Sequence, residues 1–309
     1  MAGPTFLSWR PDRTRAVLRA PAAAMLLAMF GTPALACPDT PHRFEAFSLA
    51  APALGHAKRI LVYLPPGYDC TDRRYPVLYL NDGHDLFAWN PFAADLEPAI
   101  TPKIAGEIAA REGWYGSWRL DEQLDRALAQ GDLPAMIAVG VASDDGLRSR
   151  DLAPVPWDGS AQARGLQYGR FVADTVVPVV DRTWRTIAKA RCRGIGGASL
   201  GGVSALQIGL VDRQKFGMVL ALSPVLRDPA IAAFLAMLWR HTGGAGPRVL
   251  IDVDDDPVGH ADRQWLESRI GAAPQTILVQ TASGRHAIAS WADRVIPALT
   301  KLFDGSCRG

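Results

Sequence analysis

A serine in a glycine-rich turn has the setting most typical of covalent catalysis in this chain. Gly197-Ala198-Ser199-Leu200-Gly201 matches G-x-S-x-G, with a β-rich run (RGIGG) before it and a helical pattern (LGGVSALQIGL) after it. In that context the serine sits on a tight strand-to-helix turn, which small flanking residues accommodate. We expect Ser199 to be a nucleophile, with the N–H of Leu200 available to a developing oxyanion. The alternative is a turn that only packs the helix on the strand.

A serine hydroxyl is a weak nucleophile and needs a general base. His286 follows the last β-rich run and precedes the last helical pattern. A loop histidine at the carboxyl edge of a parallel sheet can reach the serine. His42 and His56 lie early in the chain, His241 falls in an expected surface loop, and His260 begins an expected helix. We therefore predict that His286 is the base.

The base needs a carboxylate to hold its tautomer and to stabilise the imidazolium. Aspartates cluster at the end of the run VLIDV, at positions 252, 254, 255 and 256. The acid of such a triad is expected on the loop just past the strand, so Asp256 is the first candidate and Asp255 the second. The spacing also resembles a calcium loop, but Pro257 and Arg263 occupy the positions that require glycine and glutamate, which excludes that interpretation. The order serine, aspartate, histidine is that of α/β-hydrolases.

A second oxyanion donor is expected from the loop after the run PVLYL. That loop reads Asn81-Asp82-Gly83-His84-Asp85. Gly83 permits a tight backbone, and the N–H of His84 is the candidate donor. The His84 ring could instead contact the substrate, or only pack beside the nucleophile.

The elements that must position these residues alternate between strands and helices. The predicted strands are 59–64, 76–80, 134–141, 193–198, 218–222, 249–253 and 276–280, with 42–49 as an antiparallel edge strand. The predicted helices are 120–129, 168–180, 200–210 and 287–303. This alternation predicts an α/β fold with a mainly parallel sheet and helices on both faces.

The stretch between Asp82 and Pro134 is long for one connection and rich in tryptophan and tyrosine. Long aromatic insertions often build substrate pockets, and simple packing is the equal alternative. Whether residues 86–133 form a lid is open. The candidate substrate contacts are Asp85, Trp118 and Arg150, with a structural ion pair as the favoured alternative for Arg150.

The composition excludes several classes of protein. Hydrophobic residues make up 49% and charged residues 21% of the 309 residues, which is typical of a globular domain. Lys and Arg number 33 against 31 Asp and Glu, with no basic stripe, so a nucleic-acid partner is not expected. The residues imply neither a metal nor an organic cofactor.

The first 36 residues have the order of a secretory signal peptide. Arginines at 10, 13, 15 and 19 precede the short apolar run 21–30, and Ala34-Leu35-Ala36 is an A-x-A cleavage site. The run is too short to span a bilayer. We therefore predict a signal peptide at 1–36, one domain at 37–309, and a periplasmic or secreted protein with no membrane segment once the signal is removed. Cys37 directly after the site suggests a lipoprotein anchor as the alternative.

The chain resembles the putative-esterase family of α/β-hydrolases, which includes enterochelin esterases, S-formylglutathione hydrolase, feruloyl and acetylxylan esterases, and mycolyltransferases. The resemblance covers roughly residues 44–303 and depends on the segments 75–87, 118–128, 149–154, 168–210 and 283–291. It implies that Ser199 is the nucleophile, His286 the base, and Leu200 and His84 the oxyanion donors. The family usually has glycine where Val253 stands, three residues before Asp256, so the identity of the acid within 254–256 stays open.

The resemblance also implies how the four cysteines pair. In such a sheet the strand before the nucleophile starts at the edge where the last helix ends, which brings Cys192 and Cys307 together. An antiparallel first hairpin places Cys37 beside Cys70. An exported protein meets the oxidising conditions in which disulfides persist.

These observations together predict an exported serine esterase that forms an acyl-enzyme, with a small-molecule ester as its partner. The resemblance suggests siderophore, sugar or aryl esters, but the sequence does not name the ester or the oligomeric state. The same triad would serve an acyltransferase to a sugar or lipid alcohol. A non-catalytic binding protein on the same fold is the remaining alternative.

Overall fold

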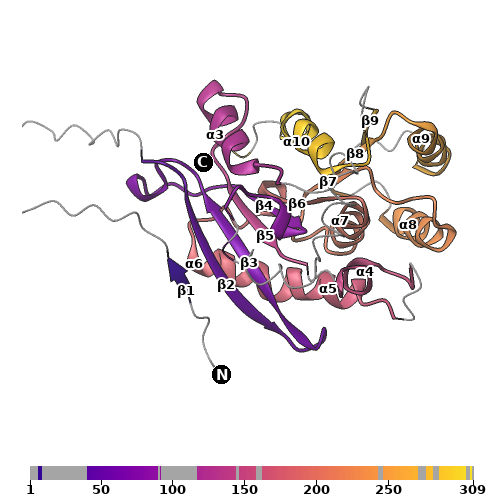
Figure 1. Ribbon diagram of the computed structural model, residues 1–309, viewed down its shortest axis with the longest axis horizontal. Coiled ribbons are helices and arrows are strands. Elements are labelled where there is room, and N and C mark those ends of the chain that lie inside the picture. The colour runs from indigo at the N-terminus through magenta and orange to yellow at the C-terminus, as the bar shows by residue number, and fades with distance from the viewer. Residues whose placement is uncertain are drawn as a thin grey trace, which may run out of the picture.

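A single twisted sheet forms the centre of the molecule (Figure 1). The computed structural model describes residues 6–8, 40–89, 91, 117–143, 146–157, 162–242, 246–270, 276–280, 285–303 and 307. Across these residues the sheet has nine strands in the order β1-β2-β3-β5-β4-β6-β7-β8-β9. The strands β4 to β9 are parallel, while β1, β2, β3 and β5 pair antiparallel in that order. This is the mainly parallel sheet of the predicted α/β-hydrolase fold.

The observed strands confirm every predicted strand to within a few residues. They are β1 (Phe6–Ser8), β2 (Arg43–Ala51), β3 (His56–Leu64), β4 (Val77–Asn81), β5 (Ile137–Val141), β6 (Arg193–Ala198), β7 (Met218–Leu222), β8 (Arg248–Val253) and β9 (Thr276–Gln280). Runs of β-branched and aliphatic residues form the inner strands, and β4, β5, β6 and β7 are buried along their whole length.

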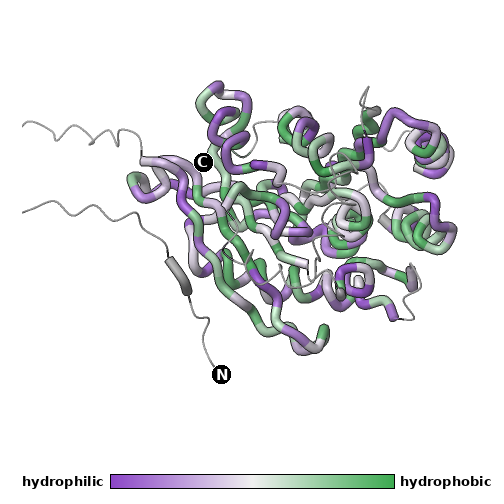
Figure 2. The backbone as a smooth tube through the Cα atoms, viewed as in Figure 1, coloured by the Kyte–Doolittle hydropathy of each residue, from purple (hydrophilic) through white to green (hydrophobic). Residues whose placement is uncertain are grey.

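Helices cover both faces of the sheet. The helices α3 (Leu120–Gln130) and α10 (Ile288–Leu302) pack on one face. The other face is covered by α4 (Arg148–Leu152), α5 (Gly165–Phe171), α6 (Val177–Thr183), α7 (Leu200–Val211), α8 (Pro229–Thr242) and α9 (Pro257–Ile270). A π-helical turn at Val172–Val176 joins α5 to α6. Figure 2 shows hydrophobic residues gathered along the inner strands and hydrophilic residues toward the periphery.

Alternation along the inner strands builds two hydrophobic cores. In β3, Ile60 and Val62 belong to the core under α5 to α9, whereas Leu61 and Tyr63 belong to the core under α3 and α10. Successive strand residues point to opposite faces, so a strand buried on both sides feeds both cores. The sheet is therefore packed on both faces, and the loops that follow its strands begin at fixed positions along its carboxyl edge.

Helix α8 is the longest of the described strands and α-helices that the sequence pattern does not predict; the short strand β1 and the short helix α4 are the others. Its sequence PAIAAFLAMLWRHT is apolar over most of its length and lacks a clear polar face. His241 was expected in a surface loop, and that placement is wrong because His241 lies in the last turn of α8. The predicted helix at 200–210 is confirmed as α7, which is buried on all sides from Leu200 to Leu210.

The predicted disulfide between Cys192 and Cys307 is confirmed, with the two Cα atoms 5.4 Å apart. Cys70 is disulfide-bonded as well, but its predicted partner Cys37 lies outside the described residues, as do the predicted cleavage site and Trp114 and Tyr115. Within the described ranges, no helix has both the length and the apolar character that crossing a membrane requires.

Candidate active site

Ser199 occupies a strained turn between β6 and α7. Its φ of +55° and ψ of −124° lie in a region that non-glycine residues rarely adopt. The turn is crowded, because a Cβ on Gly197 would lie 2.6 Å from the carbonyl carbon of Gly201. The Ser199 N–H still donates to Leu222 O at 2.9 Å, which continues the ladder with β7. The turn thus presents the serine at the carboxyl edge of the sheet.

His286 lies just before α10 and contacts the serine directly. Its Nε2 is 2.8 Å from Ser199 Oγ, within the range of a hydrogen bond in which the hydroxyl donates. The ring of Trp291 meets the imidazole edge-on, with the centroids 5.0 Å apart. The His286 side chain keeps 24% of its surface exposed, so the ring is accessible from solvent while its orientation is fixed.

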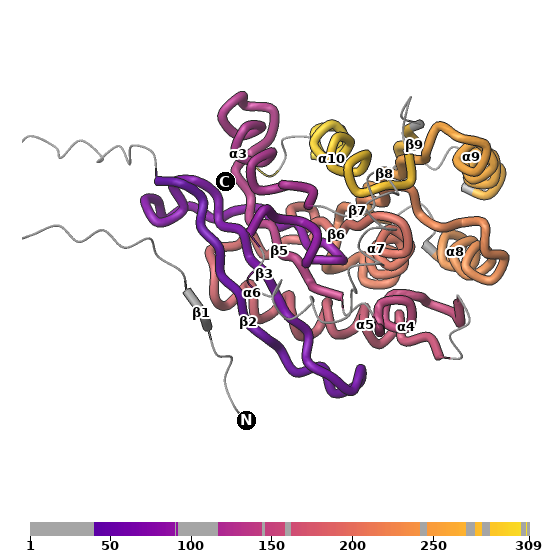
Figure 3. The backbone as a smooth tube through the Cα atoms, in the orientation of Figure 1, coloured from indigo at the N-terminus to yellow at the C-terminus, as the bar shows by residue number. Residues whose placement is uncertain are grey.

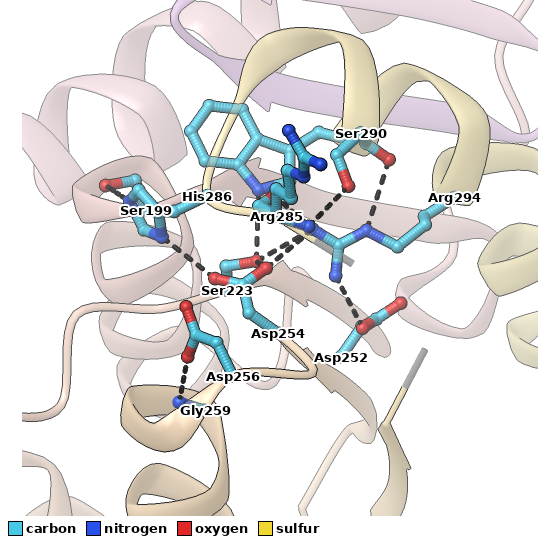
Figure 4. A network of polar contacts seen from close by, with 11 residues as sticks. Ser199, Ser223, Asp252, Asp254, Asp256, Gly259, Arg285, His286, Ser290 and Arg294 are labelled. Atoms are coloured by element: carbon cyan, nitrogen blue, oxygen red, sulfur yellow. Dashed lines mark hydrogen bonds and ion pairs between the residues drawn. The ribbon is translucent and has the colours of Figure 1, made fainter. Parts of the chain in front are cut away.

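Asp254 is the carboxylate that contacts the histidine (Figure 4). Its Oδ2 is 3.0 Å from His286 Nδ1. The predictions of Asp256 first and Asp255 second as the acid disagree with this geometry. Asp256 accepts a hydrogen bond from the Gly259 N–H at 2.7 Å, which caps the first turn of α9. Asp255 is turned toward His260, 2.9 Å away.

The second oxygen of Asp254 is also satisfied. Its Oδ1 accepts hydrogen bonds from Ser223 Oγ at 2.6 Å and from Arg294 Nη2 at 2.9 Å. Burial alone would raise the pKa of Asp254, but the hydrogen bonds from His286 and Ser223 and the charge of Arg294 lower it below its usual value. Asp254 therefore stays ionised at neutral pH and can stabilise an imidazolium.

Arg294 is a buried cation that links two strand-end acids. Its Nη1 donates to Asp252 Oδ1 at 2.9 Å, while its Nη2 donates to Asp254 and to Arg285 O. The side chain is only 4% exposed, so its charge is stabilised by these partners. No sequence pattern indicated this contact, because Arg294 is 40 residues from Asp254. Arg294 holds the Asp254 carboxylate in one orientation and also fixes the backbone beside His286.

The expected oxyanion donors both lie at this edge of the sheet. Leu200 is the first residue of α7, and an N–H in the first turn has no acceptor within its own helix. His84 lies in the short 3-10 turn η2 (Gly83–Asp85), directly after β4. A Cβ on Gly83 would lie 2.5 Å from Gly140 C, so only glycine fits this position. The His84 ring points to Asp85, with Nε2 3.4 Å from Oδ2.

A buried polar network ties η2 to the nucleophile turn. Asn81 Nδ2 donates to Gly201 O at 2.8 Å, and Tyr168 OH donates to Asn81 Oδ1 at 2.8 Å. Asp82 adopts a left-handed conformation with φ +57°. Arg148 donates to both oxygens of Asp82 at 2.8 Å. Burial alone would raise the pKa of Asp82, but Arg148 lowers it. The carboxylate is therefore ionised, and the guanidinium of Arg148 neutralises its charge beside the site.

We expect Arg148→Met to destabilise the protein by about 3 kcal/mol, because it leaves the Asp82 carboxylate buried without its partner. Urea unfolding measures the change. Without Arg148, burial raises the pKa of Asp82 above its usual value, so the variant's carboxyl takes up a proton and the penalty shrinks as the pH falls through this raised pKa. Asp82→Asn combined with Arg148→Met should recover part of the loss.

Arg119→Met is the matched control for that substitution. It breaks an exposed pair with Glu122, and such pairs contribute little to stability. If Arg148→Met had no larger effect than Arg119→Met, the Asp82–Arg148 pair would not support this loop.

The predicted substrate contacts are placed as follows. Trp118 is only 4% exposed and belongs to the core under α3, so the prediction that it contacts the substrate disagrees with the structure. Its backbone N–H donates to Asp85 O at 2.7 Å, which fixes η2. The Asp85 side chain is 32% exposed near His84. Arg150 lies 3.5 Å from Asp151, as the alternative of a structural ion pair predicted.

Comparison with known proteins identifies the family of the chain. A sequence model described as "Putative esterase" matches residues 51–296. The chain belongs to this family. Membership confirms the family resemblance drawn from the sequence. A curated relative from Bacillus subtilis (strain 168), "Uncharacterized protein YbbA", is 22% identical over 174 residues, which cover 54% of this chain and 56% of the relative. The match thus spans little more than half of that relative.

Solved structures share the fold of this chain at low sequence identity. A ferulic acid esterase is 19% identical with a TM-score of 0.60, covering 84% of this chain and 98% of that one. The enterobactin esterase from Shigella flexneri is 18% identical with a TM-score of 0.61, covering 87% and 62%. A feruloyl esterase module from Clostridium thermocellum, in complex with sinapinate, is 16% identical with a TM-score of 0.59, covering 88% and 92%.

Proposed function

We propose that this esterase hydrolyses its substrate through an acyl-enzyme on Ser199, with His286 as general base and Asp254 as the acid of the triad. The observation that carries the proposal is the pair of contacts at His286: Nε2 lies 2.8 Å from Ser199 Oγ and Nδ1 lies 3.0 Å from Asp254 Oδ2. This arrangement gives the histidine one accepting and one donating nitrogen, as proton transfer from serine requires.

In the first half of the reaction, Ser199 Oγ forms a bond to the ester carbonyl carbon while its proton moves to His286 Nε2. The carbonyl oxygen becomes an oxyanion beside the N–H groups of Leu200 and His84. When the intermediate collapses, the bond to the alcohol oxygen breaks, and His286 returns the proton to the leaving alkoxide. Asp254 stabilises the imidazolium throughout without taking its proton.

In the second half, a water molecule replaces the alcohol. It gives a proton to His286 and attacks the acyl carbon, and the proton then returns to Ser199 Oγ as the carboxylic acid leaves. All proton transfers use one imidazole, so the chemistry needs no group beyond the triad and the two donors.

Labelling with a fluorophosphonate tests the covalent step. The reagent phosphonylates an activated serine oxygen and releases fluoride. We expect mass spectrometry to place a single label on the peptide that contains Ser199, with loss of p-nitrophenyl ester hydrolysis in proportion to labelling. The Ser199→Ala variant should take up no label. Hydrolysis that persists in the fully labelled protein would refute the proposal.

The location and the substrate class are the finer parts of the proposal. The basic, apolar and A-x-A segments at 1–36 support export to the periplasm or the medium, and the Cys192–Cys307 disulfide is compatible with an oxidising compartment. A lipid anchor at Cys37 is the alternative, and mass spectrometry of the mature N-terminus separates the two.

Siderophore, sugar and aryl esters are the proposed substrates, supported by structural neighbours that act on ferulate and enterobactin esters.

A further inference from the structure

A groove of about 730 Å³ lies between α8 and α9, and none of the residues that line it belongs to the proposed triad or oxyanion donors. Figure 3 shows the two helices side by side at the end of the molecule opposite the β2–β3 hairpin. The volume is within the range of about 300–1,000 Å³ that small-molecule sites occupy. The groove is therefore large enough to accommodate part of a substrate.

The charged side chains in this groove are mostly cationic. Arg227, Arg240 and Arg269 line it together with one acid, Asp262. In the part of the chain that the structure describes, Arg227 acts electrostatically on Asp262 and lowers its pKa. Three guanidinium groups against one carboxylate leave the groove with an excess of positive charge, which favours an anionic ligand.

The near end of the groove lies beside the proposed triad. Arg227 follows Ser223, which donates to Asp254, by four residues. Helix α9 begins three residues after Asp254. Burial, more than any other influence, raises the pKa of Asp262 to about 6; the nearby charge of Arg227 lowers it, and the charges of Asp254 and His286 also act on it. The groove and the triad are thus electrostatic neighbours.

The far end carries the other two arginines. Helices α8 and α9 both return between parallel strands of one sheet, so they run in the same direction. Arg240 lies eleven residues after Pro229, which corresponds to about 16 Å of helix. Small residues line the stretch between the two ends, among them Ala232, Ala236 and Ala261. These side chains would contact an apolar arm, and Arg240 and Arg269 would contact a negative charge at its end.

We propose that the α8–α9 groove binds an extended, apolar arm of the ester substrate that ends in an anionic group, with Arg240 and Arg269 receiving a long arm and Arg227 a short one. The inference rests on the proposed function, because the ester carbonyl must reach Ser199 while the arm lies in the groove. It assigns the substrate to esters with one carboxylate-bearing arm.

Matched pairs of esters test this assignment. The two esters of a pair differ only at the end of one arm, which carries a carboxylate in one ester and the isosteric amide in the other. Different pairs have a short or a long arm, on the acyl or on the alcohol side of the ester. The measured quantity is the ratio of kcat/KM for the carboxylate to that for the amide. In the wild type we expect kcat/KM for the long-arm carboxylate to be about tenfold higher than for the amide when the arm is on one side of the ester, acyl or alcohol.

Variants of the groove should move this ratio in opposite directions. Arg240→Gln with Arg269→Gln should lower the long-arm ratio about fivefold, and each single substitution should lower it less. Arg227→Gln should lower the short-arm ratio, and Asp262→Asn should raise both about threefold. Arg182→Gln removes an exposed arginine from α6 and should leave every ratio unchanged.

The two proposals fail in different ways. A wild-type ratio near one for every arm, or a ratio that does not respond to the groove variants, would refute the anionic arm. Hydrolysis of the amide esters would then still depend on Ser199, and the proposed function would stand. Loss of the Ser199 dependence itself would refute both.

Discussion

Replacing Ser199 by alanine is expected to lower kcat for a p-nitrophenyl ester by about 10⁴- to 10⁶-fold, with little change in stability. The substitution removes the only atom that can form the acyl bond in the proposed mechanism. The oxyanion donors and the substrate site remain, so a small rate above that in buffer should persist. Ester hydrolysis under saturating substrate measures the effect, and thermal unfolding checks that the variant is folded.

Ser204→Ala is the matched control for that experiment. Ser204 lies in the same helix, is fully buried, and its hydroxyl has no hydrogen-bond partner among the described residues. Removing an unpaired buried hydroxyl is close to neutral or stabilising, so kcat should stay near the wild-type value. Substantial hydrolysis by purified Ser199→Ala would show that another group performs the attack.

Much of the fold could be predicted from local patterns. The inner strands are short apolar runs such as VLYL and MVLAL between turn residues, and their length and their valine and leucine content are typical of strands buried on both faces. The nucleophile could also be predicted, because a strained strand-to-helix turn needs small residues on both sides of Ser199 and the sequence shows them. Helix α8 could not, because its apolar run has no periodic polar face.

The contacts that orient the acid could not be predicted from the sequence. Arg294 meets Asp252 and Asp254 across 42 and 40 positions of the chain, and Trp291 Nε1 donates to Ser223 Oγ across 68. Only the packing of α10 on the sheet brings these groups together. Such buried networks depend on tertiary geometry rather than on local propensity, and their hydrogen bonds are mutually dependent.

The sequence did contain one signal that separates the three candidate acids. Asp256 is followed directly by Pro257, and an aspartate before a proline is typical of a helix N-terminus. The structure uses it so, since Asp256 accepts from the Gly259 N–H. A Cβ on Gly259 would lie 1.9 Å from Asp254 O, so this first turn of α9 packs tightly against the acid loop. Asp254, the first residue after β8, is left to face His286.

The second large effect is therefore expected at Asp254. Asp254→Asn should lower kcat by about 10⁴-fold, because an amide cannot stabilise the imidazolium and favours the wrong tautomer of His286. Asp256→Asn should leave kcat within about twofold, because asparagine caps a helix as well as aspartate does. Measuring kcat against pH for these two Asp→Asn variants thus separates the residue that acts as the triad acid from the residue that caps α9. Equal losses in both variants, or the larger loss at Asp256, would contradict the assignment, because only a carboxylate that touches Nδ1 can act on the proton that His286 carries.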